Sequence, residues 1–531
     1  MSACRYRIML DARAGDYLPF GAGRYVREIA DRLPALVPDW KWYVLRVGDG
    51  GNETQGNVTT LFRKFTYSDY PVEQEELRRV GREVKPHLVH SLWYPLAESI
   101  QAIRVLTIHD AIAFKGHPEH IASDYIHNLP WFRRSCQLAD HVITSSYVSL
   151  KDIFSTFSYP IERTSVIPLG YSDAFKHVSP QDVRRMRSQL QLPARYLFCS
   201  SHYTVSYKNL QVVREAIQIL TQAGIQIPVL VGTGGTTGVV DRHFMKLPSL
   251  PDAELAAVLA GALFMVYPSL DEGFGLPVLE AMACRVPVIC SRNGSLPEVG
   301  GDAVLYFNPE DPRDLASAIR LFLERRELRE HFGAAGLQRA SRFDWAETAR
   351  RIVTVYRRLL EDNPALLGSA VRPAITWSRV RDARHLPGAA RCRYPGELHA
   401  YGLALLAQKK SDKALAVFEA ENRRYPHQPD TLRELGKLYK DTGAWNKAAG
   451  YFKAMLRIAQ KEKLTDHLRS ACYHLADCEC RQGHYQPALA LINQCLKISP
   501  DHRAAPLMKK EIVRHMQSSG PGREAARKRV K

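Results

Sequence analysis

Short apolar runs alternate with segments of helical periodicity over residues 1–362. Runs of apolar, β-favouring residues such as 7–10 and 105–108 are separated by longer segments whose hydrophobic positions recur every three or four residues. Strands that alternate with helices in this way are typical of a mostly parallel sheet covered by helices. A connector over residues 171–193 interrupts the pattern before it starts again at 196–199. The sequence therefore predicts an α/β fold with two Rossmann-like lobes.

Small residues recur at a fixed spacing in the C-terminal part of the chain. A glycine, an alanine and a phenylalanine return 34 residues later in the same order, and a third copy follows after a shift of 40 residues. The positions are Gly402, Ala414 and Phe418, then Gly436, Ala448 and Phe452, then Ala476, Ala488 and Ile492. Small residues at fixed positions let paired helices pack closely, and this pattern resembles tetratricopeptide repeats. The concave face of such a stack usually binds a peptide or another protein.

These patterns divide the chain into five expected segments. Prolines loosen the periodicity after residue 362, as is typical of a linker. We therefore expect, in chain order, a first lobe over residues 1–178, a second lobe over 179–362, a linker over 363–394, an all-α repeat domain over 395–515 and a basic disordered tail over 516–531.

The chain carries a large positive charge, because 73 lysines and arginines face 55 aspartates and glutamates, for a net +18. A basic surface can bind nucleic acid, anionic lipid or anionic nucleotides. No nucleic-acid motif accompanies the basic tail, so we expect no nucleic-acid partner; a membrane-surface role and a merely solubilising one remain open for it. The ten cysteines are scattered, and neither a signal peptide nor a long apolar span is recognised. We therefore expect a cytoplasmic protein, with a peripheral contact at the membrane as one of the two options for the tail.

Candidate chemistry gathers after the apolar run at residues 263–267. This run reads as a strand, a loop with two glycines follows, and Pro277 suits the first turn of a helix. Glu272 lies in the loop, and Glu280 lies about one turn inside the helix. Glycines let a ligand approach the backbone, and a helix N-terminus attracts anions. A helix start alone would explain either glutamate, but together these features predict a site for a sugar phosphate.

The segment from residue 272 to residue 284 resembles the E-x7-E signature of retaining nucleotide-sugar glycosyltransferases of the glycogen-synthase-like, family-four type. The resemblance continues over residues 295–299, and it implies a GT-B fold with the acceptor on the first lobe and the donor on the second. It also implies that Glu272 contacts the donor sugar near the reacting carbon and that Glu280 holds the ribose hydroxyls. The loop residues that would complete the donor site are Gly273, Phe274, Gly275 and Leu276. One departure is Arg285, since relatives usually carry a glycine there, which eases a left-handed turn.

Other residues fit the same site. Gly21 and Gly23 follow the first strand; a simple strand-to-helix turn explains them, and the resemblance places them near the donor diphosphate. His109 follows a later strand, either as a polar strand end or as a group that positions a sugar hydroxyl, and its resemblance to the family's active-site loop favours the second reading. Lys208 can neutralise a diphosphate. Many relatives have a second cation near this lysine, which is missing here, and the candidates to compensate are His202 or a basic residue of the first lobe.

With these residues, the resemblance implies a retaining hexosyltransferase that moves a sugar from a nucleoside diphosphate to a glycan, lipid-linked or protein acceptor. Glu272, His109 and Lys208 would be catalytic, and no metal ion or other cofactor is expected, because helix N-termini and basic side chains bind the diphosphate. The main alternative is a catalytically idle sugar-nucleotide-binding adaptor that acts through its repeats, which the missing cation supports. An epimerase with the same two-lobed fold is less favoured, because those enzymes lack the acidic signature.

A group of sulfur and imidazole side chains in the repeat region invites a zinc site. Its members are Cys472, His474, Cys478, Cys480 and His484. Structural zinc sites favour cysteine pairs on turns, whereas this group falls on a predicted helix. We therefore expect no metal there.

Overall fold

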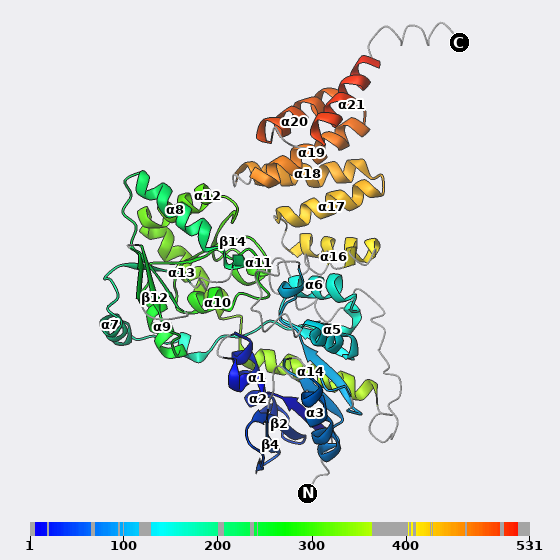
Figure 1. The fold of residues 1–531 in the computed structure, drawn as a ribbon. Coiled ribbons are helices and arrows are strands. Elements are labelled where there is room, and N and C mark those ends of the chain that lie inside the picture. Colours follow the sequence, from blue (N-terminus) through cyan, green and yellow to red (C-terminus); the bar gives the residue numbers. More distant parts are fainter. Residues whose placement is uncertain are drawn as a thin grey trace. The chain divides into compact units, whose positions relative to one another are not determined.

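The computed structural model of the chain describes residues 6–18, 21–64, 70–93, 96–98, 100–115, 129–199, 206–233, 238–241, 243–363, 402, 405–406, 410–424, 426, 428–461, 465–499 and 504–518. The chain divides into two compact units, residues 1–379 and 380–531. The first unit contains two mostly parallel sheets with their helices, and the second is helical (Figure 1). Within the described ranges, no helix has both the length and the apolar content needed to cross a bilayer.

The first lobe is built on an eight-stranded sheet in the order β3-β4-β2-β1-β5-β6-β7-β8. All neighbouring strands are parallel except β3 and β4, which are antiparallel. The strands are β1 (Arg7–Asp11), β2 (Lys41–Val47), β3 (Asn52–Gln55), β4 (Val58–Arg63), β5 (Leu88–Ser91), β6 (Ile103–Thr107), β7 (His141–Thr144) and β8 (Thr164–Val166). Every residue of β5, β6 and β7 is buried, as expected for central strands of a parallel sheet.

Helices connect these strands. They are α1 (Ala14–Tyr17), α2 (Gly21–Leu36), α3 (Tyr70–Val84), α5 (Leu129–Leu138) and α6 (Tyr147–Phe157), with the short 3-10 helix η1 (Ile112–Phe114) after β6. Helix α6 begins where it does because Ser146 is its N-cap, and the Ser146 hydroxyl accepts a hydrogen bond from the backbone N–H of Ser149 at 3.0 Å.

The second lobe repeats this plan with a seven-stranded sheet in the order β11-β12-β10-β9-β13-β14-β15. Only β11 is antiparallel to its neighbour. The strands are β9 (Tyr196–Phe198), β10 (Val229–Thr233), β11 (Gly238–Asp241), β12 (Phe244–Leu247), β13 (Met265–Tyr267), β14 (Val288–Ser291) and β15 (Leu305–Phe307). The helices are α7 (Pro180–Gln189), α8 (Leu210–Gln222), α9 (Asp252–Ala260), α10 (Leu276–Ala283), α11 (Leu296–Gly300), α12 (Pro312–Glu324) and α13 (Arg326–Ala340). The prediction of two α/β lobes is confirmed.

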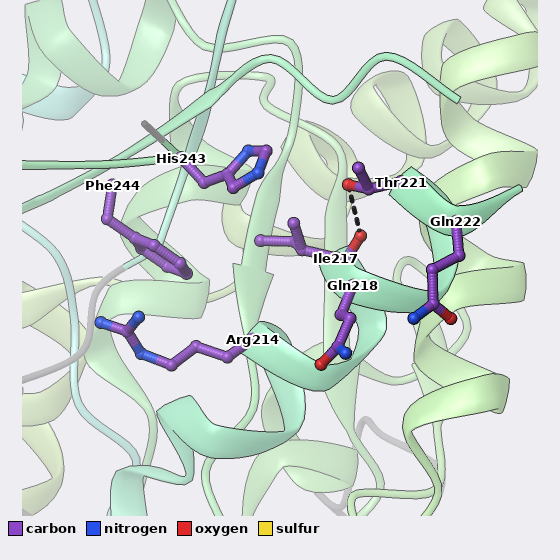
Figure 2. A pocket seen from close by; sticks show the side chains of 7 residues that line it. All are labelled: Arg214, Ile217, Gln218, Thr221, Gln222, His243 and Phe244. Atoms are coloured by element: carbon purple, nitrogen blue, oxygen red, sulfur yellow. Dashed lines mark hydrogen bonds between the residues drawn. The ribbon is translucent and has the colours of Figure 1, made fainter. Parts of the chain in front are cut away.

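An open pocket of about 410 Å³ lies between α8 and the start of β12 (Figure 2). It is lined by Arg214, Ile217, Gln218, Thr221, Gln222, His243 and Phe244. The Arg214 guanidinium lies over the Phe244 ring, 4.6 Å from its centre. None of the residues predicted from the sequence to bind a ligand lines this pocket.

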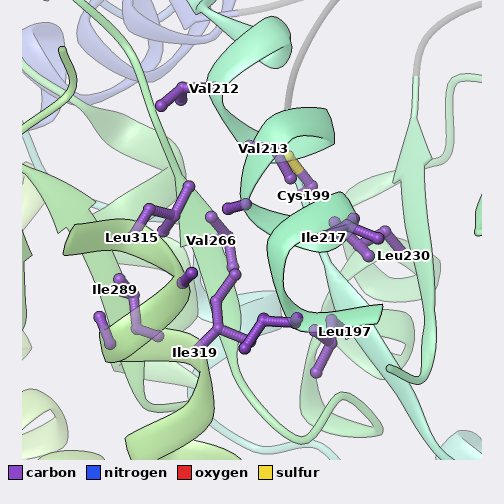
Figure 3. Packing of buried hydrophobic residues seen from close by; sticks show 14 of the residues in the cluster. Leu197, Cys199, Val212, Val213, Ile217, Leu230, Val266, Ile289, Leu315 and Ile319 are labelled. Atoms are coloured by element: carbon purple, nitrogen blue, oxygen red, sulfur yellow. The ribbon is translucent and has the colours of Figure 1, made fainter. Parts of the chain in front are cut away.

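The core of the second lobe lies between the sheet and helices α8 and α12, which pack against each other. Ile217 from α8, Ile319 from α12 and Val266 from β13 meet there (Figure 3). The alternating apolar strands and amphipathic helices seen in the sequence produce this layer, because each helix turns its apolar stripe towards the sheet.

Helix α14 (Trp345–Asp362) returns the chain to the first lobe. The Thr348 hydroxyl donates to the Pro168 carbonyl at 2.8 Å, and the Tyr356 hydroxyl is hydrogen-bonded to Nδ1 of His90 in β5. Gly170 is required at this junction, since a Cβ atom there would lie 2.2 Å from the backbone nitrogen of Trp345. The packing of this helix against the first lobe explains where the second lobe ends.

The second unit consists of helices that pack in chain order, each on the next. They are α16 (Ser411–Arg424), α17 (Pro429–Asp441), α18 (Trp445–Lys461), α19 (Thr465–Arg481), α20 (Tyr485–Ile498) and α21 (Ala505–Ser518). A Cβ atom on Gly436 would lie 2.5 Å from the Phe452 ring, and one on Gly402 would lie 2.6 Å from the Phe418 ring. The 34-residue recurrence therefore has a packing cause: each glycine makes room for the phenylalanine that follows it sixteen positions later.

The C-terminal boundary differs from the expectation. Helix α21 continues to Ser518, so residues 516–518, which were expected in the disordered tail, are helical. The reason is that Ile512 is fully buried and Met516 packs against the same core cluster, which extends the helix past the predicted end. Most of the predicted linker, residues 364–394, and the rest of the tail, residues 519–531, lie outside the described residues.

Candidate active site

The glycine-bearing loop joins strand β13 to helix α10, as predicted. The strand ends at Tyr267 and the helix begins at Leu276, with Pro277 in its first turn. Gly275 has a φ of 96°, in the left-handed region, and a Cβ atom there would lie 2.6 Å from a methyl carbon of Leu296. Glycine at this position therefore satisfies both the backbone turn and the close approach of α11.

Glu272 lies in this loop and is only 9% exposed. Its Oε1 atom accepts hydrogen bonds from Lys208 Nζ at 2.5 Å and from the Tyr267 hydroxyl at 2.7 Å. Burial disfavours the charged lysine, but attraction to Glu272 more than offsets this and raises the pKa of Lys208. Lys208 ends the 3-10 helix η5 (Ser206–Lys208), just before α8. Two of the three residues predicted to be catalytic are thus in direct contact.

Glu280 lies one turn inside α10 and is 4% exposed. Its carboxylate forms an ion pair with Arg24 of α2, in the first lobe. Arg24 also pairs with Asp252, the first residue of α9. Burial raises the pKa of Glu280, and the nearby guanidinium opposes that rise. This three-membered cluster joins the two lobes, and no sequence pattern pointed to it, since Arg24 and Glu280 are 256 positions apart.

Gly21 and Gly23 form the first turn of α2, beside this cluster. A Cβ atom on Gly21 would lie 3.6 Å from a methyl carbon of Leu276, so the start of α2 faces the start of α10 across the lobes. A Cβ atom on Gly23 would lie 1.8 Å from the Leu18 carbonyl oxygen. Gly23 is therefore explained by chain packing, and only Gly21 faces the predicted donor loop.

His109 follows strand β6 and packs between two rings. The Tyr25 ring meets it edge-on with 4.6 Å between centres, and the Trp93 ring stacks on it at 5.8 Å. Burial lowers the pKa of His109 to about 4, so the imidazole is neutral at pH 7. Its Nε2 atom is buried and has no hydrogen-bond partner among the described residues.

The backbone of His109 lies against the glycine loop of the other lobe. A Cβ atom on Gly273 would lie 2.6 Å from the His109 carbonyl oxygen, so only glycine permits this approach. The Ser149 hydroxyl lies 2.6 Å from the His109 carbonyl and 3.1 Å from the Gly273 carbonyl, within hydrogen-bonding distance of both. Asp110, the next residue, has its pKa raised to about 6 by burial, and Glu272 and Asp271 act in the same direction.

Two further polar contacts hold the lobes together at the same seam. Lys115 of the first lobe pairs with Asp271, the residue before Glu272, at 2.6 Å. Glu298, in α11, caps helix α6 of the first lobe: its two carboxylate oxygens each accept a backbone hydrogen bond, one from Tyr147 and one from Val148, both at 2.9 Å. The segment 295–299 was singled out in the sequence, but its partner could not be inferred from it.

The other predicted residues lie as follows. The Phe274 and Leu276 side chains are 7% and 8% exposed, and Phe274 packs against Phe343. Both were predicted to bind the donor, and this stays a prediction, because Glu272 and Glu280 are buried to a similar extent. His202 lies outside the described residues. Arg285 takes the left-handed conformation with a φ of 59°, so the turn forms without the glycine.

No metal site accompanies these residues in the described part of the chain, which contains no group of three or more histidine, cysteine or carboxylate side chains placed to hold an ion. Cys472 and Cys478 of the suspected zinc group are instead fully buried in the helical core. The His474 ring stacks on Phe452 with 5.0 Å between centres. These side chains are explained by helix packing.

Two family models match the chain. Residues 20–175 match Glycosyltransferase Family 4, and residues 182–339 match Glycosyl transferases group 1. An O-antigen chain mannosyltransferase B from Escherichia coli is 30% identical over 291 residues, which cover 52% of this chain and 76% of that protein. An MMP alpha-(1->4)-mannosyltransferase from Mycolicibacterium hassiacum is 32% identical over 236 residues, 43% of this chain and 56% of that protein. The chain therefore spans little more than half the length of the second relative.

A solved structure supports the fold. Sucrose-phosphate synthase from Thermosynechococcus elongatus superposes with a TM-score of 0.53 at 20% identity, covering 67% of this chain and 100% of that one. At this identity the likeness shows a common two-lobed, GT-B-like fold and nothing about substrates. Because both lobes match glycosyltransferase families, and the likeness to the O-antigen chain enzyme extends over three quarters of that protein, the chain belongs to the family 4, group 1 glycosyltransferases.

Proposed function

We propose that this chain is a retaining hexosyltransferase that moves mannose from a nucleoside-diphosphate donor to the end of a lipid-linked glycan. The observation that carries the proposal is the position of Glu272 and Glu280. Both carboxylates are buried at the seam between the lobes, and each is paired with a basic side chain. The names of the similar mannosyltransferases support the choice of sugar, and the O-antigen chain enzyme supports a glycan acceptor.

In the proposed donor complex, hydroxyl groups replace the basic side chains on the two carboxylates. The ribose hydroxyls donate to Glu280, and a hydroxyl of the sugar donates to Glu272. The Lys208 ammonium, released from Glu272, then neutralises the phosphate next to the sugar. The N-terminus of α10 adds backbone N–H groups and the positive end of the helix dipole. After this exchange each buried carboxylate is hydrogen-bonded to a hydroxyl group, and the lysine charge faces the phosphate.

Transfer with retention then needs no protein nucleophile. The bond between C1 of the sugar and the phosphate oxygen breaks, and its electron pair leaves with the nucleoside diphosphate. The acceptor hydroxyl bonds to C1 on the same face, and its proton passes to the leaving phosphate oxygen. Positive charge grows on the sugar ring and negative charge on the phosphate, so Glu272 stabilises the first and Lys208 the second. His109, uncharged at pH 7, orients a sugar hydroxyl through its free Nε2 atom.

We also propose that no divalent metal takes part, since Lys208 and the helix N-terminus supply positive charge at the phosphates. Turnover should then be the same in the presence of a chelator as in added magnesium. A loss of turnover on chelation that magnesium restores would contradict this part of the proposal.

The test of the transferase is a donor and acceptor screen read by mass spectrometry. Nucleoside-diphosphate mannose, glucose and galactose would each be offered with short mannosides, and the anomeric configuration of any product would be read by NMR. Glu272→Ala should abolish transfer. Glu330→Ala should not, because Glu330 is exposed and forms its ion pair with Arg326, which is also exposed. Equal release of nucleotide by Glu272→Ala and the unaltered protein would overturn the assignment, and an inverted product would overturn retention.

We further propose that the helical unit is a tetratricopeptide-type stack that recruits a polypeptide. The 34-residue period and the glycines that admit Phe418 and Phe452 support this. Cross-linking of the full-length chain in cells, followed by mass spectrometry, should place partner cross-links on α16 to α21. Cross-links confined to residues 1–363 would contradict the proposal.

A further inference from the structure

Arg24 is the cation that links the lobes at Glu280, and its surroundings are unusual for a structural arginine. It lies on the first turn of α2, and only 14% of its side chain is exposed. One guanidinium nitrogen binds Glu280 and another binds Asp252. The flat face of the group rests on the Phe175 ring, 5.7 Å from its centre. One positive charge therefore serves two carboxylates, and the cluster as a whole is negative.

The place that Arg24 occupies is the one in which the proposed function puts the ribose hydroxyls. Arg24 binds the Oε1 atom of Glu280, so a ligand whose hydroxyl groups take that oxygen has to displace the guanidinium. If Arg24 simply moved into solvent, its ion pairs with Glu280 and Asp252 would be lost while the ribose gained hydrogen bonds to Glu280. The two carboxylates would then keep the site negative while a diphosphate entered it. Negative charge entering a negative site is disfavoured unless a cation moves with it.

The geometry gives the displaced guanidinium a second destination. Gly21, one turn before Arg24, lies against Leu276, the first residue of α10. Glu280 is four residues further along α10, about 6 Å along the helix axis. The N-terminus of α10 is where the proposed function places the phosphates, so the Arg24 guanidinium would have to move by about this distance, from Glu280 to that end of the helix.

We infer that Arg24 is a positioning residue that exchanges partners during donor binding: it holds Glu280 and Asp252 in the empty enzyme and moves to the donor diphosphate when the ribose takes Glu280. This deepens the proposed function, on which it rests. Arg24, from the first lobe, then takes the place of the second cation that many relatives carry near Lys208. Lobe closure and diphosphate recognition depend on this one side chain. Arginine suits the role because its planar fork binds carboxylate and phosphate groups equally well.

The experiment compares a nucleoside with its diphosphate. Affinities for guanosine and GDP, and for uridine and UDP, would be measured by calorimetry or by competition with a fluorescent nucleotide. The ratio of the two dissociation constants reports how much the diphosphate contributes. In Arg24→Ala this ratio should fall at least fivefold, while the nucleoside alone should bind as well as before or better, because no guanidinium competes for Glu280.

Arg46→Ala is a matched control. Arg46 also bridges two carboxylates, Asp16 at 3.2 Å and Asp31 at 2.8 Å, but all three residues belong to the first lobe. In Arg46→Ala the ratio of the dissociation constants of nucleoside and nucleoside diphosphate should be the same as in the unaltered protein. Arg24→Lys should keep part of the diphosphate contribution, because it preserves the charge but not the fork. This variant also shows that the effect is not one of folding.

Two results would overturn the inference. An unchanged ratio in Arg24→Ala would mean that the guanidinium does not reach the phosphates, and weaker binding of the nucleoside would mean that Arg24 does not compete with the ribose. A failure of the proposed function looks different: the unaltered protein would then bind neither GDP nor UDP in preference to its nucleoside.

Discussion

The Lys208 ammonium lies 2.5 Å from a carboxylate oxygen of Glu272, although the two residues are 64 positions apart. The pair is mostly withdrawn from solvent, with 17% of the lysine side chain and 11% of the glutamate side chain exposed. Such a pair is more costly to break than to replace, because removing one partner leaves the other charged and buried.

Lys208→Met should therefore lower the free energy of unfolding by about 3 kcal/mol, as well as abolish transfer. The double variant Lys208→Met, Glu272→Gln should regain most of that stability, since no buried charge is left unpaired, but not the activity. Denaturant titration measures the stability of each variant, and the donor and acceptor screen measures transfer. Arg326→Met, which breaks the exposed Arg326–Glu330 pair, serves as the control and should be neutral. A double variant as unstable as the single one would show that the lysine acts through packing.

Glu298→Ala should weaken the joint between the lobes. The carboxylate caps α6 from the other lobe, so its loss should lower the free energy of unfolding by about 1 kcal/mol, as for other N-caps. It should also raise the KM for the donor severalfold, because the two lobes lose a contact that holds them together. The Asp311 side chain caps α12 within the second lobe, accepting a hydrogen bond from the Arg313 N–H at 2.9 Å. Asp311→Ala should lower the free energy of unfolding by a similar amount and leave the KM for the donor unchanged. Equal KM values in both variants would argue against a role in closure.

The stability of the first unit should fall in acid partly through His109. Its pKa is lowered from 6.5 to about 4 in the folded protein by burial. Above pH 6.5 the imidazole is neutral in both the folded and the unfolded chain, so the folded state carries no penalty. As the pH falls from 6.5 towards 4 the unfolded chain takes up the proton first, and the folded state loses stability. His109→Gln should therefore show a shallower decline in Tm between pH 7 and pH 4.5.

The comparison has to be made between variant and unaltered protein, because Asp110 titrates in the same range. Its pKa is raised to about 6 by burial, so its contribution has the opposite sign and favours the folded state as the pH falls. The same pH series on Asp110→Asn should show a steeper decline than that of the unaltered protein. Parallel curves for His109→Gln and the unaltered protein would contradict the assignment of a neutral, buried imidazole.

Two glycines of the helical unit should respond oppositely to alanine. Gly436→Ala places a Cβ atom 2.5 Å from the fully buried Phe452 ring and should cost about 1–3 kcal/mol. Gly450 lies in α18, and a Cβ atom added there would have nothing within 4 Å, so Gly450→Ala should add about 1 kcal/mol through helix propensity. Thermal unfolding followed by circular dichroism distinguishes them, and equal shifts would contradict the packing argument.

The sequence was sufficient to predict those parts of the site whose residues are close together in the chain. Strand β13, the loop of Glu272 and helix α10 follow one another without a break, so apolar pattern, glycines and Pro277 predict them together. Strand and helix alternation likewise predicted both lobes. The 34-residue period predicted helical packing, because each glycine and its phenylalanine lie close in the chain.

Contacts between the lobes could not be predicted in the same way. Arg24 with Glu280, Lys115 with Asp271, and Glu298 with α6 depend on how two separately folded sheets face each other, and no periodicity in one lobe encodes a position in the other. The packing of Phe274 could not be predicted for a similar reason: its partner, Phe343, lies 69 residues later, and the loop sequence does not identify that partner.

The chain passes between the lobes twice, and both passages touch. Residues up to Gly170 leave the first lobe, helix α14 re-enters it from Trp345, and Gly170 and Trp345 are packed so closely that no side chain fits between them. The two connections are therefore held against each other at one point of the boundary between the lobes. A hinge at this junction would let the lobes rotate while both connections stay in contact, and under the proposed function the donor would then enter at the edge away from the junction.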